Sequence, residues 1–347
     1  MSNTHGADRR VLRWAGIGTG TISRSVLPDL TAVEGSEVHL VHSRSAEKAR
    51  AFAEEFGIPR HSENLDAVLR DPDIDAVYIA TPHAAHFPQA KAALEAGKHV
   101  LVEKPMALNS AQVGELFALA EERGLFLMEA MWMKFGSAFT ELMRRVEAGV
   151  IGDVTNVRAS FSVPQPEGTG SRFDLARSGG ALLDQGIYPV TLMHALLGTP
   201  DEVLARGSVR DDGLDLASHF SLEYNDGRYA QGASALDGFS ELTASVAGTQ
   251  GWLTLTAPFW ANASLEVHAG SMKAIFVEPE VQRFEWEGNG YVPMARAVVE
   301  AIGAGLMQHP LHTAEHTLAV FGTLDTILAQ IRSAGARRGT SGRGEGK

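Results

Sequence analysis

Three polar side chains stand where proton transfer is possible. Lys104 directly follows the apolar segment His99–Val102, and burial of a lysine disfavours its charged form, so that the amine can exchange a proton. Asp184 and Tyr188 are four residues apart where a helix is expected to begin, which places both on one face. A phenol beside a carboxylate can act as a general acid or base. The alternatives are an exposed lysine and a tyrosine packed in the core.

A glycine-rich turn near the N-terminus offers a place for a phosphate-bearing ligand. The turn lies between a strand expected over residues 11–17 and a helix expected over residues 21–31. Backbone N–H groups can approach a pyrophosphate there, and the helix N-terminus favours its negative charge. The dinucleotide fingerprint has its third glycine where this chain has Thr21. The expected cofactor loop consists of Gly16, Gly18, Thr19, Gly20, Thr21 and Ile22.

The end of the second expected strand, Glu37–His42, bears on which dinucleotide binds. NAD sites place an acidic residue there, on the ribose 2′-hydroxyl. This chain instead has Ser43 and Arg44, with Lys48 one helical turn later. Arginine forms charge-assisted, bidentate pairs with phosphate, so these residues suit a 2′-phosphate. We therefore expect NADP, with NAD as the alternative and a solvated arginine as the non-functional explanation.

Further polar residues follow two later strands, and ligands of open parallel sheets bind beyond the carboxyl ends of strands. These residues are Thr81, Pro82, His83 and His86 after the strand expected over Ala76–Ala80, and Glu103 after His99–Val102. His83 and His86 have the i, i+3 spacing of possible metal ligands. The chain has no HExxH motif, no cysteine and no evident third ligand, so we expect no metal.

Strand and helix alternate through the first third of the chain. The remaining elements expected there are helices over Ala46–Phe56, Leu65–Leu69, Pro88–Ala96 and Ser110–Arg123 and a strand over Leu125–Met128. Alternation of helices with continuously apolar strands predicts βαβ units, and hence a doubly wound parallel sheet of the Rossmann type.

After about residue 150 the pattern changes to apolar residues at every second position. The strands expected there are Val154–Val163, Val203–Val209, His219–Tyr224, Arg228–Ala233, Glu241–Ala247, Gly251–Thr256, Leu265–His268 and Met272–Phe276. Asn225-Asp226-Gly227 is a strong hairpin signal, and helices are expected over Met294–Ala304 and Ala314–Ile331. This predicts an α+β domain with a large, mainly antiparallel, open sheet.

Length and composition limit the possible classes. A chain of 347 residues with ordinary apolar content corresponds to about two domains. We expect short disordered tails over 1–9 and 336–347, a dinucleotide-binding domain over 10–130 and a substrate-binding and dimerisation domain over 131–335. The absence of cysteine excludes a disulfide scaffold and a cysteine nucleophile.

The remaining composition concerns partners and location. A net charge of −12 argues against nucleic-acid binding. No apolar run approaches the roughly 20 residues of a membrane span, and the first residues lack the apolar core of a signal peptide. We therefore expect a cytoplasmic protein with a small-molecule substrate and no membrane or nucleic-acid partner.

Several longer segments carry a resemblance to a known family. These are the Gly16–Thr21 loop, AVYIATPHAAH (76–86), ALEAGKHVLVEKPMALN (93–109), MEAMWMKF (128–135) and SRFDLARSGGALLDQGIYPV (171–190). In this order and spacing they resemble the Gfo/Idh/MocA oxidoreductases, the glucose–fructose oxidoreductase and inositol dehydrogenase family. Within it, the chain is most similar to the branch that holds dimeric dihydrodiol dehydrogenase and NADP-dependent D-xylose dehydrogenase.

The resemblance implies roles for individual residues. It makes Lys104 the residue that assists proton transfer and orients the substrate hydroxyl, and Tyr188 the acid/base. Asp184 becomes the acidic partner, and His83 matches a histidine implicated in the dihydrodiol branch. The nicotinamide end of the cleft is expected to be lined by Trp132 and Arg172. The resemblance also implies a homodimer formed through the open face of the second sheet.

Three kinds of function follow from these expectations. The first is NADP-dependent hydride transfer between nicotinamide and a sugar or cyclic polyol, with a trans-dihydrodiol as an alternative substrate. The second is glycoside cleavage that uses the nicotinamide transiently with no net redox change. The third is a non-catalytic NADP-binding module, which would have no need of Lys104, Asp184 and Tyr188 together.

Overall fold

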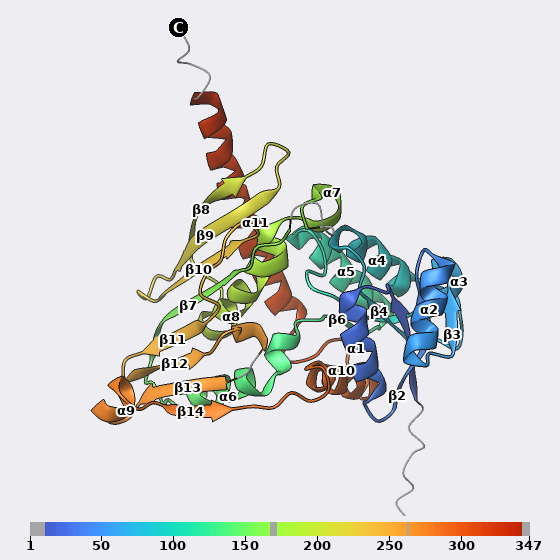
Figure 1. Ribbon diagram of the computed structural model, residues 1–347, viewed down its shortest axis with the longest axis horizontal. Helices are drawn as coiled ribbons and strands as arrows, with labels where there is room; N and C mark the ends of the chain where they lie inside the picture. Colours follow the sequence, from blue (N-terminus) through green and yellow to red (C-terminus); the bar gives the residue numbers. More distant parts are fainter. Residues whose placement is uncertain (1–10, 167–171, 262–263, 342–347) are drawn as a thin grey trace, which may run out of the picture.

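The computed structural model describes residues 11–166, 172–261 and 264–341, which form two β-sheets with helices packed around them (Figure 1). In the first sheet the strand order is β3-β2-β1-β4-β5-β6, and every pairing is parallel. Its strands are β1 (Leu12–Ile17), β2 (Ser36–His42), β3 (Arg60–Ser62), β4 (Ala76–Ile79), β5 (His99–Val102) and β6 (Leu127–Glu129). The chain reverses direction across the sheet between β1 and β4, as in a doubly wound fold.

Helices cover this sheet in the alternation that the sequence predicts. They are α1 (Thr21–Thr31), α2 (Ala46–Phe56), α3 (Leu65–Leu69), α4 (His86–Glu95) and α5 (Ser110–Arg123). Side chains cap the starts of three of them: Ser45 for α2, Asn64 for α3 and Asn109 for α5. Gly57 and Gly124 end α2 and α5 with left-handed backbone.

The second sheet has the order β14-β13-β12-β11-β7-β10-β9-β8 and is antiparallel except where β7 and β10 run parallel. Its strands are β7 (Val154–Ser162), β8 (Glu202–Val209), β9 (Asp215–Glu223), β10 (Tyr229–Ala235), β11 (Ala244–Gly248), β12 (Gly251–Leu255), β13 (Ser264–Ala269) and β14 (Glu280–Arg283). The predicted turn at residues 225–227 joins β9 to β10. The predicted fold class is therefore confirmed.

Six α-helices belong to the second half of the described chain, and the longest of them packs against both sheet regions. The helices of this half are α6 (Ser137–Glu147), α7 (Leu175–Ser178), α8 (Ile187–Leu197), α9 (Met272–Phe276), α10 (Val292–Gly303) and α11 (Ala314–Ser341). In Figure 1, α11 runs from the β8 end of the second sheet towards the first sheet. It packs against β8, α8 and α5, and α10 packs against α1.

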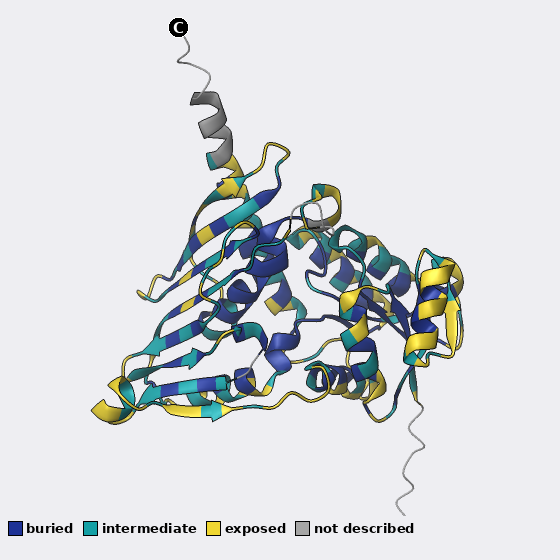
Figure 2. Cartoon of the chain, in the orientation of Figure 1, coloured by how far each residue is buried: buried dark blue, intermediate teal, exposed yellow. Residues whose placement is uncertain are grey.

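The core follows from this arrangement. Figure 2 shows buried residues concentrated in the strands of the first sheet and in the helices between the sheets, whereas α2, α3 and α9 carry much of the exposed surface. Trp14, Tyr78 and Phe321 are fully buried. Burial of each such side chain contributes about 2 kcal/mol or more to the stability of the fold.

Some sequence predictions were wrong. Residues 272–276 form helix α9 rather than a strand, because Ser271 caps the helix by accepting the N–H of Ala274 at 3.1 Å. Five residues are too few to distinguish the helical period of about 3.6 residues from the strand period of two. The short strands β3 and β14 were missed since they are largely exposed and carry little apolar signal, and α6 begins without a capping side chain.

The two predicted disordered tails can be compared with the structure only in part. Helix α11 continues to Ser341, beyond residue 336, where we expected a disordered tail to begin. Alanine and arginine, which dominate residues 334–338, are good helix formers. The predicted N-terminal tail over 1–9 lies outside the described residues. Among the helices that the structure describes, none combines the length and apolar character needed to cross a membrane.

Candidate active site

A pocket of about 390 Å³ lies where the ends of β4 and β5 face the start of α8. The predicted site residues that line it are Ile22, Thr81, His83, His86, Glu103, Lys104, Trp132, Arg172, Asp184 and Tyr188. The lining residues that the sequence analysis missed are Phe161, Val163, Gln165, Gln185, Trp260 and Tyr291. Residues from both halves of the chain thus meet in one cavity.

The glycine turn lies beside this pocket, after β1. A side chain at Gly18 would place its Cβ 2.5 Å from the carbonyl oxygen of Ala80, and φ is +114° there, so only glycine fits. A Cβ at Gly16 would lie 2.6 Å from Leu27 of α1, which explains the close approach of helix and strand. A Cβ at Gly20 would have no atom within 4 Å, so that position does not require glycine. A turn between a strand and a helix N-terminus can accommodate a pyrophosphate, and Ile22 of α1 lines the pocket.

The end of β2 presents cationic rather than acidic groups. Arg44 and Lys48 are exposed and lie on either side of Ser45, the residue that caps α2. Ser45 accepts the N–H of Lys48 at 3.3 Å. Ser43 accepts the N–H of Ser45 at 3.4 Å. These residues do not line the pocket, but they occupy the strand end at which a dinucleotide ribose binds in this fold. Their chemistry fits a 2′-phosphate.

Glu103 and Lys104 form a turn with a cis peptide bond to Pro105. The Glu103 carboxylate accepts the hydroxyl of Tyr78 at 2.8 Å and the N–H of Lys104 at 3.2 Å. Burial raises the pKa of Glu103 to about 7. Its carboxyl is therefore half protonated near neutral pH, in the wall of the pocket.

This pKa gives a prediction for stability. Because the folded-state pKa lies above the ordinary value of 4.5, the stability that Glu103 contributes is fully present below pH 4.5 and is lost as the pH rises through about 7. In Glu103→Gln this loss, on the order of 3 kcal/mol at most, should disappear. Thermal unfolding between pH 5 and 8 measures it. Glu141→Gln is the control, since Arg144 and Arg145 beside that half-buried carboxylate keep it ionised throughout. Equal pH slopes in all three proteins would contradict the prediction.

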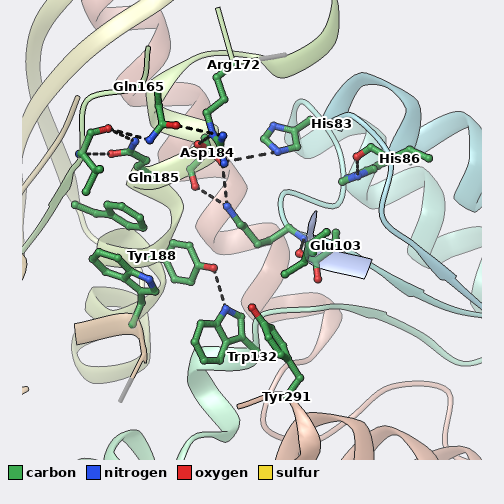
Figure 3. A pocket seen from close by; sticks show the side chains of 16 residues that line it. His83, His86, Glu103, Trp132, Gln165, Arg172, Asp184, Gln185, Tyr188 and Tyr291 are labelled. Carbon is green, nitrogen blue, oxygen red and sulfur yellow. Dashed lines mark hydrogen bonds and ion pairs between the residues drawn. The ribbon is translucent and has the colours of Figure 1, made fainter. Parts of the chain in front are cut away.

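Figure 3 shows Asp184 between Arg172 and His83, and the Lys104 ammonium is bonded to it as well. Its Nζ lies 3.1 Å from Asp184 Oδ1 and donates to the Asp184 backbone carbonyl at 2.7 Å. Arg172 Nε donates to Asp184 Oδ2 at 2.5 Å, and His83 Nε2 lies 3.9 Å from Oδ1. Burial alone would raise the pKa of Asp184, but Lys104, His83 and Arg172 hold it well below its usual range. Asp184 is thus a permanent anion that orients Lys104.

Local backbone explains how one residue offers Lys104 two oxygens. Leu182–Gly186 is a π-helical segment at the start of α8. Such segments interrupt the regular i to i−4 bonding of an α-helix and occur often at functional sites. The Asp184 carbonyl is accordingly available to Lys104. The predicted pairing of Asp184 and Tyr188 on one side of the helix places both in the pocket.

Tyr188 lies beside Lys104 and is buried. Its hydroxyl accepts the indole N–H of Trp132 at 3.0 Å, and the Lys104 Nζ lies 5.0 Å from the centre of its ring. Burial, followed by the charge of Glu103, raises the pKa of Tyr188 far above 10. Tyr188 is therefore a neutral phenol that can donate its proton.

The two histidines after β4 do different things. His83 faces Asp184 across the pocket. His86 is 1% exposed, and its two ring nitrogens lie 2.7 Å from the carbonyl oxygens of Thr81 and Pro105. His86 therefore links the turn after β4, which contains Thr81 and Pro82, to the turn that carries Lys104. No cluster of three or more potential metal ligands occurs within residues 11–166, 172–261 and 264–341.

The missed residues form an aromatic wall and a polar corner. Phe161 and Trp260 stack with their ring centres 3.5 Å apart, and Trp132 lies 4.7 Å from Tyr291. Gln185 holds the end of β7 by two 3.0 Å bonds to the backbone of Val163. Alternation along β7 was a signal for Phe161, whereas Trp260 and Tyr291 come from connecting segments that no motif marks.

Tyr291 is brought to the pocket by a contact between distant parts of the chain. Asp29, in α1, is 2% exposed. Its carboxylate accepts the N–H groups of Asn289 and Tyr291 at 2.9 Å each. A Cβ on Gly288 would lie 2.5 Å from Asp29 Oδ1, at φ +61°, so this approach requires glycine.

Comparison with known proteins agrees with this geometry. Residues 12–131 match the sequence profile of the Gfo/Idh/MocA oxidoreductase family, described as an NAD-binding Rossmann fold, and residues 139–254 match the C-terminal domain of the same family. The chain is 34% identical to trans-1,2-dihydrobenzene-1,2-diol dehydrogenase of Mus musculus over 93% of its own length and 96% of that protein. It is 44% identical to dTDP-3,4-didehydro-2,6-dideoxy-alpha-D-glucose 3-reductase of Streptomyces violaceoruber over 62% of its own length and 64% of that protein.

A solved structure matches over most of the chain. KijD10, a 3-ketoreductase from Actinomadura kijaniata, in complex with NADP and TDP-benzene, superposes with a TM-score of 0.83 at 30% identity and covers 92% of this chain and 98% of its own. With both domain profiles matched and relatives of this identity over nearly the full length, this chain belongs to the Gfo/Idh/MocA family and is a nicotinamide-dependent oxidoreductase acting on CH–OH groups.

Proposed function

We propose that the protein transfers a hydride between NADP and a secondary alcohol or carbonyl carbon of a sugar or cyclic polyol. The observation that carries this proposal is the cluster of Lys104, Asp184 and Tyr188 in one pocket beside the glycine turn. A protein that only stored or sensed the cofactor would have no use for a buried phenol and an ammonium fixed by a buried carboxylate.

The residues divide the proton chemistry between them. In the reducing direction the Tyr188 phenol donates its proton to the substrate oxygen, and the Lys104 ammonium stabilises the charge that develops there. In the oxidising direction these steps run in reverse: the substrate hydroxyl gives its proton to a Tyr188 oxygen that has already lost its own, and the Lys104 ammonium stabilises that phenolate beforehand. Asp184 keeps Lys104 in place, with Arg172 and His83 balancing its charge. When bound, the nicotinamide supplies or accepts the hydride.

The shape of the pocket supports a ring-shaped substrate. The Phe161–Trp260 stack offers a flat apolar surface, and Arg172, Gln165 and Gln185 provide hydrogen-bonding groups in the same cavity. A cyclic substrate has an apolar face for the first and hydroxyl groups for the second. The matched relatives are named for cyclic substrates as well, so trans-dihydrodiols remain an alternative within the same chemistry.

The test is a panel of pentoses, hexoses, inositols and dihydrodiols with NADP⁺ and with NAD⁺, followed at the absorbance of reduced nicotinamide. We expect NADPH to accumulate with at least one cyclic alcohol. Cleavage of a glycoside without accumulation of NADPH would instead identify a redox-neutral enzyme. A protein that binds NADP and transforms no member of the panel, in either direction, would contradict the proposal.

The preference for NADP is tested at Arg44. In Arg44→Asp the expected loss of one charge-assisted bond, together with repulsion by the new carboxylate, weakens NADP binding by about 10- to 100-fold. NAD binding should hold or improve, since an acidic residue suits the 2′-hydroxyl. Fluorescence titration with both cofactors measures the ratio. Arg50→Asp, an exposed change in the helix that follows Arg44, should leave the ratio unaltered. An unchanged ratio in Arg44→Asp would contradict NADP selection.

We further propose a homodimer formed through the open face of the second sheet. Arg158, Gln231, Ser245 and Thr254 are cross-strand neighbours on that face, and Trp252 stacks on His268 4.3 Å away. Light scattering should give twice the chain mass of 37.1 kDa, and Gln231→Glu should reduce it to that of one chain. A monomer in the wild-type protein would contradict this. A cytoplasmic location stays a prediction from the sequence.

A further inference from the structure

A buried carboxylate stands behind the turn that carries Lys104. Glu129 ends β6, is 1% exposed and is absent from the pocket lining. One of its oxygens accepts the N–H of Met106 at 2.9 Å. The other lies 3.1 Å from Nε2 of His312, which is also 1% exposed. A side chain from the sixth strand therefore holds the residue two positions after Lys104.

Three polar backbone groups of this turn bond to side chains, and two of these side chains come from other elements. The N–H of Lys104 donates to Glu103, and the carbonyl of Pro105 is bonded by His86 of α4. The N–H of Met106 is bonded by Glu129 of β6. Met106 is fully buried, so without Glu129 its N–H would lack a partner away from water. The direction in which Lys104 leaves the turn depends on these bonds.

His312 connects Glu129 to the last helix. It lies two residues before α11, and α11 in turn contacts the helix of Tyr188 through Thr323, whose hydroxyl lies 2.9 Å from His194 Nε2. The segment 312–323 therefore contacts both Glu129 and the helix that carries Tyr188. The contact between His312 and Glu129 is the only side-chain bond from the described part of the segment 304–313 to β6.

We propose that Glu129 is a positioning residue for Lys104: its carboxylate, oriented by His312, fixes the turn at Met106 so that the ammonium reaches Asp184 and the substrate. This rests on the role proposed above for Lys104. Glu129 touches no reacting atom and acts only through the turn.

The charge of Glu129 supplies a readout that a purely structural contact would not. The titratable groups facing it are Lys134, which is 7% exposed in the one-turn helix 132–135, His312, and His86 of α4. Burial lowers the pKa of all three groups, so the two histidines are neutral near pH 7. Lys134 in turn lies near His309 and His316. On the pocket side, Glu129 raises the pKa of Glu103 and of Tyr188, although burial contributes more to both shifts. Removing its charge should lower both pKa values.

The experiment compares Glu129→Gln and His312→Gln with two matched controls, Glu115→Gln on α5 and the exposed His316→Gln on α11. Glu129→Gln keeps the shape but replaces the charged acceptor of the Met106 N–H by a neutral amide oxygen, whose hydrogen bond is weaker. His312→Gln removes the imidazole that orients the Glu129 carboxylate. Hydrogen exchange of the peptide that covers residues 103–107 is measured without cofactor, and kcat and KM are measured across pH. A displaced catalytic group costs about 10- to 100-fold in rate, so we expect kcat to fall by that factor in both variants, with KM within about threefold.

In both variants, exchange at 103–107 should also rise by about tenfold or more. In Glu129→Gln the acid limb of the kcat profile should move to lower pH, while both controls match the wild type. Wild-type kcat, exchange and pH profile in both variants would overturn the proposal, as would faster unfolding with no change in kcat or profile. If one variant does not fold, the other decides. Full turnover in Lys104→Met would refute the proposed function alone, because exchange at 103–107 still reports whether Glu129 holds the turn.

Discussion

Lys104→Met is expected to lower kcat by about 10²- to 10⁴-fold while NADP affinity stays within about threefold, because a positioned proton-transfer group contributes that much to rate. Methionine has a similar length and no charge, so it fills the space and cannot bond the substrate oxygen. Asp184 keeps Arg172 as its partner, which limits the loss of stability. Stopped-flow absorbance of NADPH measures turnover, and quenching of tryptophan fluorescence measures cofactor binding, since Trp132 lines the pocket.

Lys98→Met is the matched control. Lys98 is a buried lysine just before β5, at the opposite end of the strand from Lys104, and it donates to the carbonyls of Asp71 and Ile74 at 2.7 Å each. Its loss should lower the temperature of unfolding but leave kcat unchanged at a temperature where the protein is folded. Wild-type turnover in Lys104→Met, or an equal loss in both variants, would contradict the role given to Lys104.

Tyr188→Phe is expected to produce the second large effect, again about 10²- to 10⁴-fold in kcat. The ring and its contacts with Phe161 and Trp260 stay in place, so the change removes only the hydroxyl that gives the proton to the substrate oxygen. KM should change little. Because the pKa of Tyr188 lies far above 10, the hydroxyl should not itself titrate in the rate profile between pH 6 and 9.

Tyr224→Phe provides the comparison. Tyr224 is buried in the second sheet, and its hydroxyl donates to the carbonyl of Gly198 at 3.0 Å, away from the pocket. The loss of this bond should cost about 1 kcal/mol of stability with no effect on kcat. If Tyr188→Phe retained wild-type kcat, proton delivery by Tyr188 would be refuted and Lys104 alone would remain as the donor.

The parts of the fold that the sequence predicted are those that depend on local pattern. Continuous apolar strands, glycines that end helices and the 225–227 turn report on neighbouring residues, so the parallel sheet and the β9–β10 hairpin were found. The parallel pairing of β7 with β10 joins segments some 70 residues apart. No local pattern encodes such a pairing, and strand propensity depends on the neighbours that a strand acquires.

The same division applies to the candidate site. Lys104, Asp184 and Tyr188 were found because short motifs mark them. The Phe161–Trp260 stack and Tyr291 were not, because an aromatic residue at a pocket has the same type and spacing as one in a core. The π-helical segment at 182–186 was also beyond reach, since the i, i+4 rule that paired Asp184 with Tyr188 assumes a regular helix.

The contact between Asp29 and the 289–291 segment has a consequence for biosynthesis. Asp29 emerges early from the ribosome, but the N–H groups that satisfy its carboxylate are made some 260 residues later. His312, which reaches Glu129, comes later still. A nascent chain that already holds the glycine turn and Lys104 therefore lacks both tethers until residues 289–312 have been made. The cofactor loop and the lysine turn are thus synthesised first and fixed in position last.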